Sequence, residues 1–207
     1  MTINKNYKLC VFDVDGVIVK SDVLYYEIAK IHNTNLNRDE LCMRISKGGE
    51  ALFSYIFGNN YTSEDVAWFR KMQKELFIPE KHLYDGIKEI LQDISSKYMI
   101  AIVSNKPEKI IHHMLSESNM AQYFNKVIGR DSGYATKPDA DGINKLIEIF
   151  QIDKKSVIFF GDSVIDSEAC KSADISFAHC RYGFDDNVIP CDYELNDITA
   201  IRDILGL

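Results

Sequence analysis

The residues best suited to chemistry are two pairs of aspartates that follow short apolar runs. Asp13 and Asp15 come at the end of one run, and Asp162 and Asp166 come after another. Two carboxylates two positions apart point the same way if the strand continues, and two that are four apart share a face of a helix. An acidic turn after a strand is common, so neither pair would indicate a functional site by itself.

Two other segments carry groups that could hold an anion. Ser104 and Asn105 precede Pro107, where the next helix is expected to begin, and a helix N-terminus attracts negative charge. A serine N-cap is the plain structural alternative for Ser104. Lys137 is expected to head a further helix, where the helix dipole disfavours a cation, so we expect an anionic group to hold it there.

These segments predict a metal site if they meet at one edge of a sheet. Asp13, Asp15, Asp162 and Asp166 would then form a cluster of four carboxylates. Each like-charged pair about 4 Å apart costs on the order of 4 kcal/mol at an effective dielectric of about 20, which one lysine cannot offset. A divalent cation is therefore required, and an all-oxygen set without a His or Cys motif favours Mg²⁺ over zinc or copper.

The elements that must position these residues follow from the apolar pattern. Five short runs read as buried strands: Lys8–Phe12, Met99–Val103, Lys126–Ile128, Val157–Phe160 and Ile175–Ala178. Apolar residues at three and four spacing between the later runs indicate crossover helices. This alternation predicts an α/β fold with a doubly wound, Rossmann-like parallel sheet, whose ligand site lies at the carboxyl ends of the strands.

One region breaks the alternation. Residues 21–79 show helical periodicity and little strand signal, so we expect an all-α cap inserted into an α/β core of residues 1–20 and 80–207. Within the cap, two short helices are expected around Gly48 and another helix with Ser63 at its N-cap. A lobe inserted directly after the first strand would sit over that strand's carboxyl end.

Composition excludes several classes of function. The chain has 24 Lys plus Arg and 31 Asp plus Glu. The net charge of −7 provides no positive field that would attract nucleic acid. The apolar runs are far shorter than the roughly 20 residues of a membrane helix, and residues 1–8 are too polar for a signal peptide, so we expect a cytoplasmic protein without membrane association. Five scattered cysteines predict neither disulfides nor a zinc motif, and the five histidines are interpreted as surface or boundary residues.

Taken in order, four of these segments carry a resemblance. Asp13–Val17, Ser104-Asn105, Lys137-Pro138 and Gly161–Asp166 resemble the ordered motifs of the haloacid dehalogenase-like superfamily. The pattern is similar to its phosphatase branch with an α-helical cap, which includes phosphoglycolate phosphatases and β-phosphoglucomutases. The resemblance implies an aspartyl-phosphate intermediate formed by Asp13.

The resemblance also implies the other catalytic roles. Asp15 would protonate the leaving oxygen and then activate water. Ser104, the Asn105 backbone and Lys137 would hold the transferring phosphoryl oxygens.

For the metal, the resemblance implies Mg²⁺ bound by Asp13, the Asp15 carbonyl and Asp162. Asp166 would order its waters or orient Lys137.

Substrate selection is expected in the cap. Arg44, Lys47 and Gly48 form a basic turn that could reach a second anionic group of a substrate, and a solvated helix junction is the alternative. Asp22 is interpreted as a substrate contact or a helix N-cap. Most cap aromatics are expected in its core, with one or two lining the cavity.

The predicted function is a Mg²⁺-dependent phosphatase of a small phosphorylated metabolite. A β-phosphoglucomutase-like phosphomutase is the first alternative. Such an enzyme usually carries a basic or imidazole residue near the position of Asp22, whereas here Tyr25 and Tyr26 follow and no histidine comes before His32. The other alternative is a catalytically silent binding or regulatory protein. The presence of a candidate residue for every catalytic role argues against it.

Overall fold

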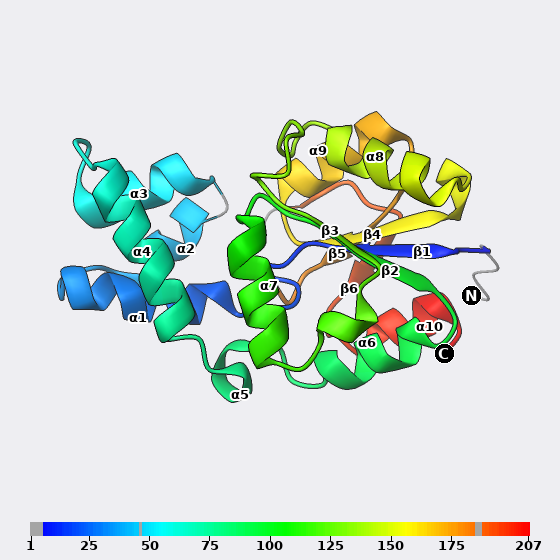
Figure 1. Cartoon of the computed structure of the whole chain (residues 1–207), viewed down its shortest axis with the longest axis horizontal. Coiled ribbons are helices and arrows are strands. Elements are labelled where there is room, and N and C mark those ends of the chain that lie inside the picture. Colours follow the sequence, from blue (N-terminus) through cyan, green and yellow to red (C-terminus); the bar gives the residue numbers. More distant parts are fainter. Residues whose placement is uncertain (1–5, 46, 185–187) are drawn as a thin grey trace.

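Parallel strands form the centre of the structure, a computed structural model that describes residues 6–45, 47–184 and 188–207. The described strands are β1 (Leu9–Phe12), β2 (Met99–Val103), β3 (Lys126–Ile128), β4 (Val157–Gly161), β5 (Ser176–Cys180) and β6 (Tyr193–Leu195). They lie in the order β3-β2-β1-β4-β5-β6, and each neighbouring pair is parallel (Figure 1). This is the order of a doubly wound, Rossmann-like sheet, so the predicted fold class is confirmed.

The ends of three strands differ from the prediction. β1 begins at Leu9, β4 continues to Gly161, and β5 runs two residues further than expected. The extension of β5 has a physical reason, because its last two residues, His179 and Cys180, pair with β6.

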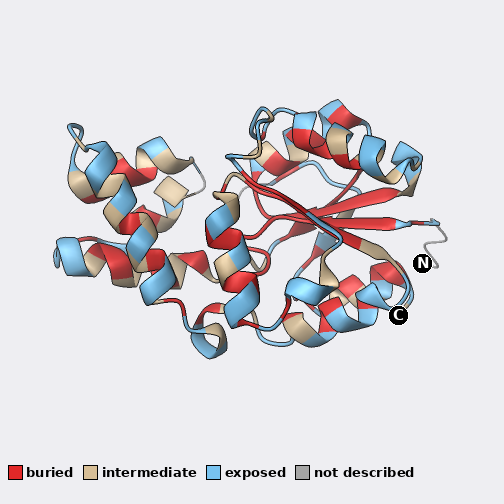
Figure 2. Cartoon of the chain, in the orientation of Figure 1, coloured by how far each residue is buried: buried red, intermediate tan, exposed pale blue. Residues whose placement is uncertain are grey.

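Alternate residues of the central strand pack into two separate cores, one on each face of the sheet. Cys10 and Phe12 of β1 belong to one core, and Leu9 and Val11 to the other. The first face is covered by helices α6 (Ile87–Ser95), α7 (Glu108–Glu117) and α10 (Ala200–Leu205), and the second by α8 (Asp141–Phe150) and α9 (Val164–Ala173). Burial on both faces explains why the strand residues are apolar without alternation (Figure 2).

Four further helices form a group beside the sheet, here called the helical lobe (Figure 1). They are α1 (Ser21–His32), α2 (Arg38–Ile45), α3 (Gly49–Phe57) and α4 (Ser63–Glu75). Aromatic rings hold the lobe together, since Phe69 makes edge contacts with Tyr25, Phe53 and Phe57. All four helices fall within residues 21–79, and the division of the chain into core and cap at those boundaries stays a prediction.

The lobe joins the rest of the chain through two neighbouring connections. Lys20 N–H donates to the His82 carbonyl at 2.7 Å, and Tyr84 N–H donates to the Ile18 carbonyl at 3.1 Å. The second connection contains the short helix α5 (Pro79–His82). The chain therefore leaves and re-enters the core at one place, where backbone hydrogen bonds tie both crossings together.

Two local predictions are wrong. The N-cap of α4 is Thr62 and not Ser63, because a start one residue earlier lets Thr62 N–H donate to the Asp65 carboxylate while Thr62 Oγ1 accepts from Asp65 N–H. His82 and His179 are buried and not at the surface. His82 is the last residue of α5 in the second connection, where its Nδ1 accepts from Ile78 N–H, and His179 belongs to a fully buried strand.

In the described part of the chain, no helix is both long and apolar enough to cross a bilayer. The expectation that residues 1–8 are too polar for a signal peptide concerns a segment of which only residues 6–8 are described.

Candidate active site

Three aspartates meet where the carboxyl ends of β1 and β4 lie side by side. Asp13 follows β1 and Asp162 follows β4, and the two strands are paired up to Phe12 and Phe160. Asp166 lies in the first turn of α9, where its carboxylate accepts hydrogen bonds from the N–H and hydroxyl of Ser163. Carboxylate oxygens of the three aspartates lie within 4.8 Å of one another.

The side chain of Asp15 is not part of this group, so the predicted cluster of four carboxylates is wrong. The strand stops at Phe12, and the next residues form a turn in which the Val14 carbonyl accepts from Ile18 N–H and Val19 N–H. Because the extended backbone ends there, the alternation of side chains does not carry through to Asp15. A cluster of all four carboxylates would require the strand to continue to Asp15, and it ends at Phe12.

Asp15 has its own set of partners. Ser21 Oγ donates to Asp15 Oδ1, Tyr25 Oη lies 3.4 Å from both carboxylate oxygens, and Lys106 Nζ lies 2.9 Å from Oδ1. Ser21 and Tyr25 come from the helical lobe, whereas Lys106 follows β2. The carboxylate is thus held between the lobe and the sheet.

Lys137 provides the positive charge for the aspartate group. Its Nζ lies 2.6 Å from Asp166 Oδ1 and 3.0 Å from Asp13 Oδ1, and the side chain is buried. It does not head a helix, because α8 begins at Asp141 and Lys137 lies in the preceding loop. Asp13 and Asp166 are the anionic partners that were expected for Lys137. Since Lys137 lies in a loop, no helix dipole acts on it from its own helix.

Asn105 fixes the loop that carries this lysine. Its Nδ2 donates to the Lys137 carbonyl at 2.9 Å, and its Oδ1 accepts from Lys137 N–H at 3.0 Å. The two bonds position the backbone of Lys137 against the end of β2. Ser104, one residue earlier, is buried, and its Oγ accepts from Lys106 N–H at 3.3 Å.

Burial shifts the proton affinities of these groups. Burial raises the pKa of Asp13 to about 6, with Lys137 opposing the shift and Asp166 adding to it. Burial and the carboxylates of Asp166 and Asp13 raise the pKa of Asp162 well above its ordinary value. Burial alone would lower the pKa of Lys137, yet the carboxylates of Asp13 and Asp166 raise it, so this ammonium stays charged.

The donor set fits a hard divalent cation. Lys137 pairs with two of the three clustered carboxylates, those of Asp13 and Asp166, and among the described residues Asp162 has no ion pair. Two glycines pack directly on Asp162: a Cβ on Gly16 would lie 1.9 Å from its Oδ2, and a Cβ on Gly183 would lie 2.5 Å away. Close oxygen donors with an excess of negative charge are what Mg²⁺ takes in proteins.

A cavity of about 170 Å³ opens from this group toward the helical lobe, and we call it the active-site cavity. Its sheet side includes Asp13, Asp15, Ser104, Asn105 and Lys137, which the sequence predicts as site residues. Its lobe side includes an aromatic wall formed by Tyr25, Phe53 and Phe69. The strand ends and the lobe thus enclose one space between them.

The residues predicted to select the substrate occupy different places. Gly48 lines the active-site cavity, whereas Lys47 is exposed. Arg44 pairs with Glu40 at 3.7 Å, on its own helix, and is not part of the cavity wall.

Asp22 does not cap α1 and does not line the active-site cavity. The N-cap position of that helix belongs to Lys20. Asp22 pairs with Arg38 at 2.5 Å and lines a separate, more open cavity of about 630 Å³.

Sequence reasoning missed three basic residues of the active-site cavity, Arg70, Lys106 and Arg130. Lys106 was detectable in principle, because it directly follows the Ser104-Asn105 motif. Arg130 also had a signal, because it comes two residues after β3, whose carboxyl end lies on the same edge of the sheet. Arg70 lies on α4 without a distinguishing pattern.

Known proteins resemble this chain along most of its length. The sequence profile of the haloacid dehalogenase-like hydrolase family matches residues 10–180. A curated phosphoglycolate phosphatase from Vibrio parahaemolyticus serotype O3:K6 is 26% identical over 196 residues, which are 87% of this chain and 86% of that protein.

Solved structures share the fold. One described as a predicted phosphoglycolate phosphatase from Haemophilus somnus 129pt has a TM-score of 0.84 at 22% identity and covers 98% of this chain and 99% of its own. A candidate β-phosphoglucomutase from Thermotoga maritima has a TM-score of 0.76 at 21% identity and covers 96% and 98%. At these identities the likeness is one of fold.

Proposed function

The chain belongs to the haloacid dehalogenase-like hydrolase family, and from that premise we propose that it is a Mg²⁺-dependent phosphatase of a small phosphorylated metabolite. One observation carries the proposal. Asp13 and Asp15 lie at one cavity in two different environments, Asp13 with Lys137 and Asp15 with Lys106. Two carboxylates held apart in this way can take the separate roles of nucleophile and acid-base group.

Asp13 is the nucleophile of this proposal. A carboxylate oxygen of Asp13 attacks phosphorus, the bond from phosphorus to the leaving oxygen breaks, and Asp15 donates a proton to that oxygen. Water then attacks the aspartyl phosphate, Asp15 accepts its proton, and the bond between Asp13 and phosphorus breaks to release phosphate. Both aspartates return to their starting forms, so the cycle balances.

Ser104, the Asn105 backbone and Lys137 hold the transferring oxygens. Their place at the end of β2 and in the neighbouring loop supports this, because both reach the cavity that contains Asp13. Mg²⁺ held by Asp13, the Asp15 carbonyl and Asp162 would supply positive charge against the phosphoryl oxygens. Asp166 contacts Lys137 directly, which supports the role of orienting that lysine.

The helical lobe acts as the cap of this proposal. Ser21 and Tyr25 of α1 bond the Asp15 carboxylate, so the lobe contributes to the position of the acid-base group as well as to the cavity wall. A small cavity with arginine in its wall suits a small, polar leaving group. Phosphoglycolate is the first compound to test, since relatives carry the name of its phosphatase.

The test is a turnover screen with Mg²⁺ across phosphoglycolate, sugar phosphates, nucleoside monophosphates and pyrophosphate. We expect phosphate release from one of them, and we expect Asp13→Asn to lower kcat by at least about 100-fold, since the amide cannot attack phosphorus. Asp85→Asn is the matched control, because Asp85 is exposed and pairs with Lys20 outside the cavity.

Transfer between two positions of a sugar without release of phosphate would identify the mutase instead. No turnover in any arm would favour the binding or regulatory alternative. Retention of more than about one-hundredth of the rate by Asp13→Asn would remove Asp13 from the role of nucleophile.

A further inference from the structure

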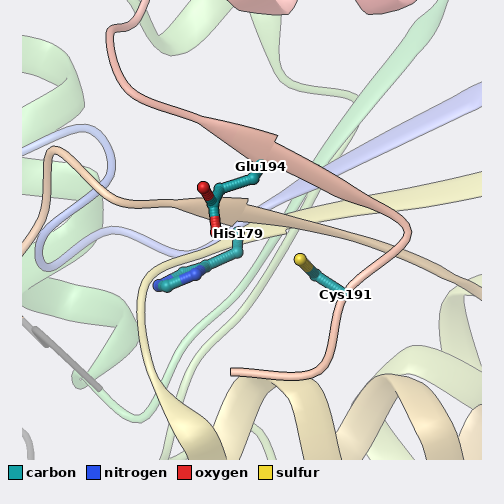
Figure 3. A group of neighbouring side chains, drawn as sticks. All are labelled: His179, Cys191 and Glu194. Carbon is teal, nitrogen blue, oxygen red and sulfur yellow. The ribbon is translucent and has the colours of Figure 1, made fainter. Parts of the chain in front are cut away.

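A second group of metal-binding side chains lies outside the active-site cavity, beside β5 and β6. Ligand atoms of His179, Cys191 and Glu194 all lie within 4.8 Å of one another, and Figure 3 shows the three side chains gathered there. His179 is buried, whereas Cys191 and Glu194 are exposed. The group is open to solvent on one side and anchored in the sheet on the other.

Strand pairing brings these side chains together. His179 and Glu194 are partners in the register of β5 and β6, so their side chains project from the same face of the sheet. Cys191 lies two residues before β6, and its neighbour Asp192 is tied to β5 by two bonds with Phe177, at 2.9 Å and 3.0 Å. The backbone that carries all three residues is thus fixed.

We propose that His179, Cys191 and Glu194 bind a divalent transition metal of the zinc class. An imidazole nitrogen, a thiolate sulfur and a carboxylate oxygen are ligands that zinc takes, and a thiolate does not suit Mg²⁺ or Ca²⁺. With a neutral imidazole, the thiolate and carboxylate carry two negative charges, which balance the ion. The metal–sulfur bond replaces the S–H bond of Cys191, and the proton passes to solvent.

The local charges agree with a site that takes a cation. Burial and the Glu194 carboxylate raise the pKa of the Cys191 thiol, and a bound cation would favour the thiolate. Arg181 Nη1 lies 3.3 Å from Glu194 Oε1, in an exposed ion pair that a bound metal must weaken. Removal of Arg181 should therefore strengthen metal binding.

The site lies next to a segment that reaches the catalytic aspartates. The chain leaves β5 at Cys180, and four residues later Phe184 N–H donates to Asp162 Oδ2 at 3.1 Å. A metal at this site would join β5 to β6, which is one of the two edge strands of the described sheet. Zinc should therefore raise the melting temperature by binding to the folded state.

Cobalt(II) is the probe, because thiolate ligation gives a near-ultraviolet charge-transfer band that oxygen ligands do not. Metal-free protein is titrated with cobalt in excess Mg²⁺, which occupies the aspartate site. We expect the band to saturate at one equivalent, to disappear when zinc is added, and to be absent in Cys191→Ser. Cys42→Ser is the matched control and should keep the band, since Cys42 is also a free, solvent-accessible thiol.

Two further variants test the oxygen ligand without touching the buried histidine. Glu194→Gln should weaken zinc binding by at least about tenfold, and Arg181→Gln should strengthen it. Absence of the band in the wild-type protein, or its persistence in Cys191→Ser, would overturn the proposal. Unchanged zinc affinity in Glu194→Gln would do so as well, and none of these readouts depends on phosphatase activity.

Discussion

Each of the two aspartates that the proposed chemistry needs is paired with its own lysine. Lys137 lies 3.0 Å from Asp13, and Lys106 lies 2.9 Å from Asp15. Both ammonium groups are buried, and in both cases the neighbouring carboxylates raise the lysine pKa against the effect of burial. Each lysine therefore keeps its charge, and each aspartate faces a fixed cation.

The raised pKa of Asp13 predicts a pH-dependent loss of stability in metal-free protein. Between the ordinary value of 3.8 and about 6, the folded carboxyl keeps a proton that the unfolded one has lost. The free energy of unfolding therefore falls by on the order of 3 kcal/mol as pH rises through that window. Above the window it no longer changes with this group. The measurement is urea unfolding in chelator at several pH values, with Asp13→Asn as the reference that cannot titrate there.

Above pH 6 the variant should be the more stable of the two without metal, and near pH 4 the difference should shrink. A variant less stable than wild type at neutral pH would contradict the burial of an ionised Asp13.

At the scale of elements, glycine turns at Gly16 and Gly183 pack against Asp162, and the first of them can be tested. Gly16 follows β1 with φ +76°, and a Cβ there would lie 1.9 Å from Asp162 Oδ2. We expect Gly16→Ala to displace this carboxylate and to lower kcat and Mg²⁺ affinity by at least about tenfold each. Steady-state kinetics with a Mg²⁺ titration measures both.

Gly58→Ala is the control for backbone strain. Gly58 has φ +92°, yet nothing lies within 4 Å of an added Cβ. It should cost about 1–3 kcal/mol of stability and leave kcat and Mg²⁺ affinity unchanged. Equal kinetic effects of the two substitutions would mean that contact with Asp162 is not the cause.

The loop after β3 is expected to contribute more to substrate selection than the basic turn of the lobe. Arg130 lines the active-site cavity, and a Cβ on Gly49 would lie 3.5 Å from its Nη1. If the substrate carries a second anionic group, Arg130→Met should lower the ratio of kcat/KM for that substrate to kcat/KM for a small aryl phosphate. Loss of one charged hydrogen bond predicts about 10- to 100-fold.

Arg44→Ala is the comparison, because Arg44 pairs with Glu40 and stacks on Tyr55 without lining the cavity. Its ratio should not change. A change with Arg44→Ala and none with Arg130→Met would return specificity to the turn that the sequence indicated.

At the scale of the whole molecule, we expect metal binding by the aspartate group to stabilise the folded chain. A ligand that binds only the folded state at about 100 times its dissociation constant adds about 2.7 kcal/mol, which predicts a rise in melting temperature of roughly 5–10 °C for a chain of this size. We expect millimolar Mg²⁺ to give such a rise over chelator. Asp162→Ala should abolish it, and Asp85→Ala, which removes an exposed carboxylate, should not.

Equal melting temperatures with Mg²⁺ and with chelator, in protein verified to be metal-free, would count against a preformed carboxylate site.

What the sequence determined by itself is the sheet and the segments at its edge. The apolar runs are too short for helices, and parallel strands place their carboxyl ends at one edge, so Asp13 and Asp162 were expected at the same edge of the sheet. Ser104 reaches the same cavity for the same reason, because it directly follows β2. The local pattern was sufficient for these three residues, because each one directly follows its own strand. Lys137 lies in a loop, which the bonds with Asn105 hold in place.

The tertiary structure alone decided which side chains touch. Asp15 leaves the aspartate group because the chain turns after Phe12, and it gains Tyr25 and Lys106, which are 81 residues apart. The register of β5 and β6 likewise brings His179 and Glu194 together. Such contacts depend on how whole elements dock against one another, and a local pattern of apolar and polar residues carries no information about that docking.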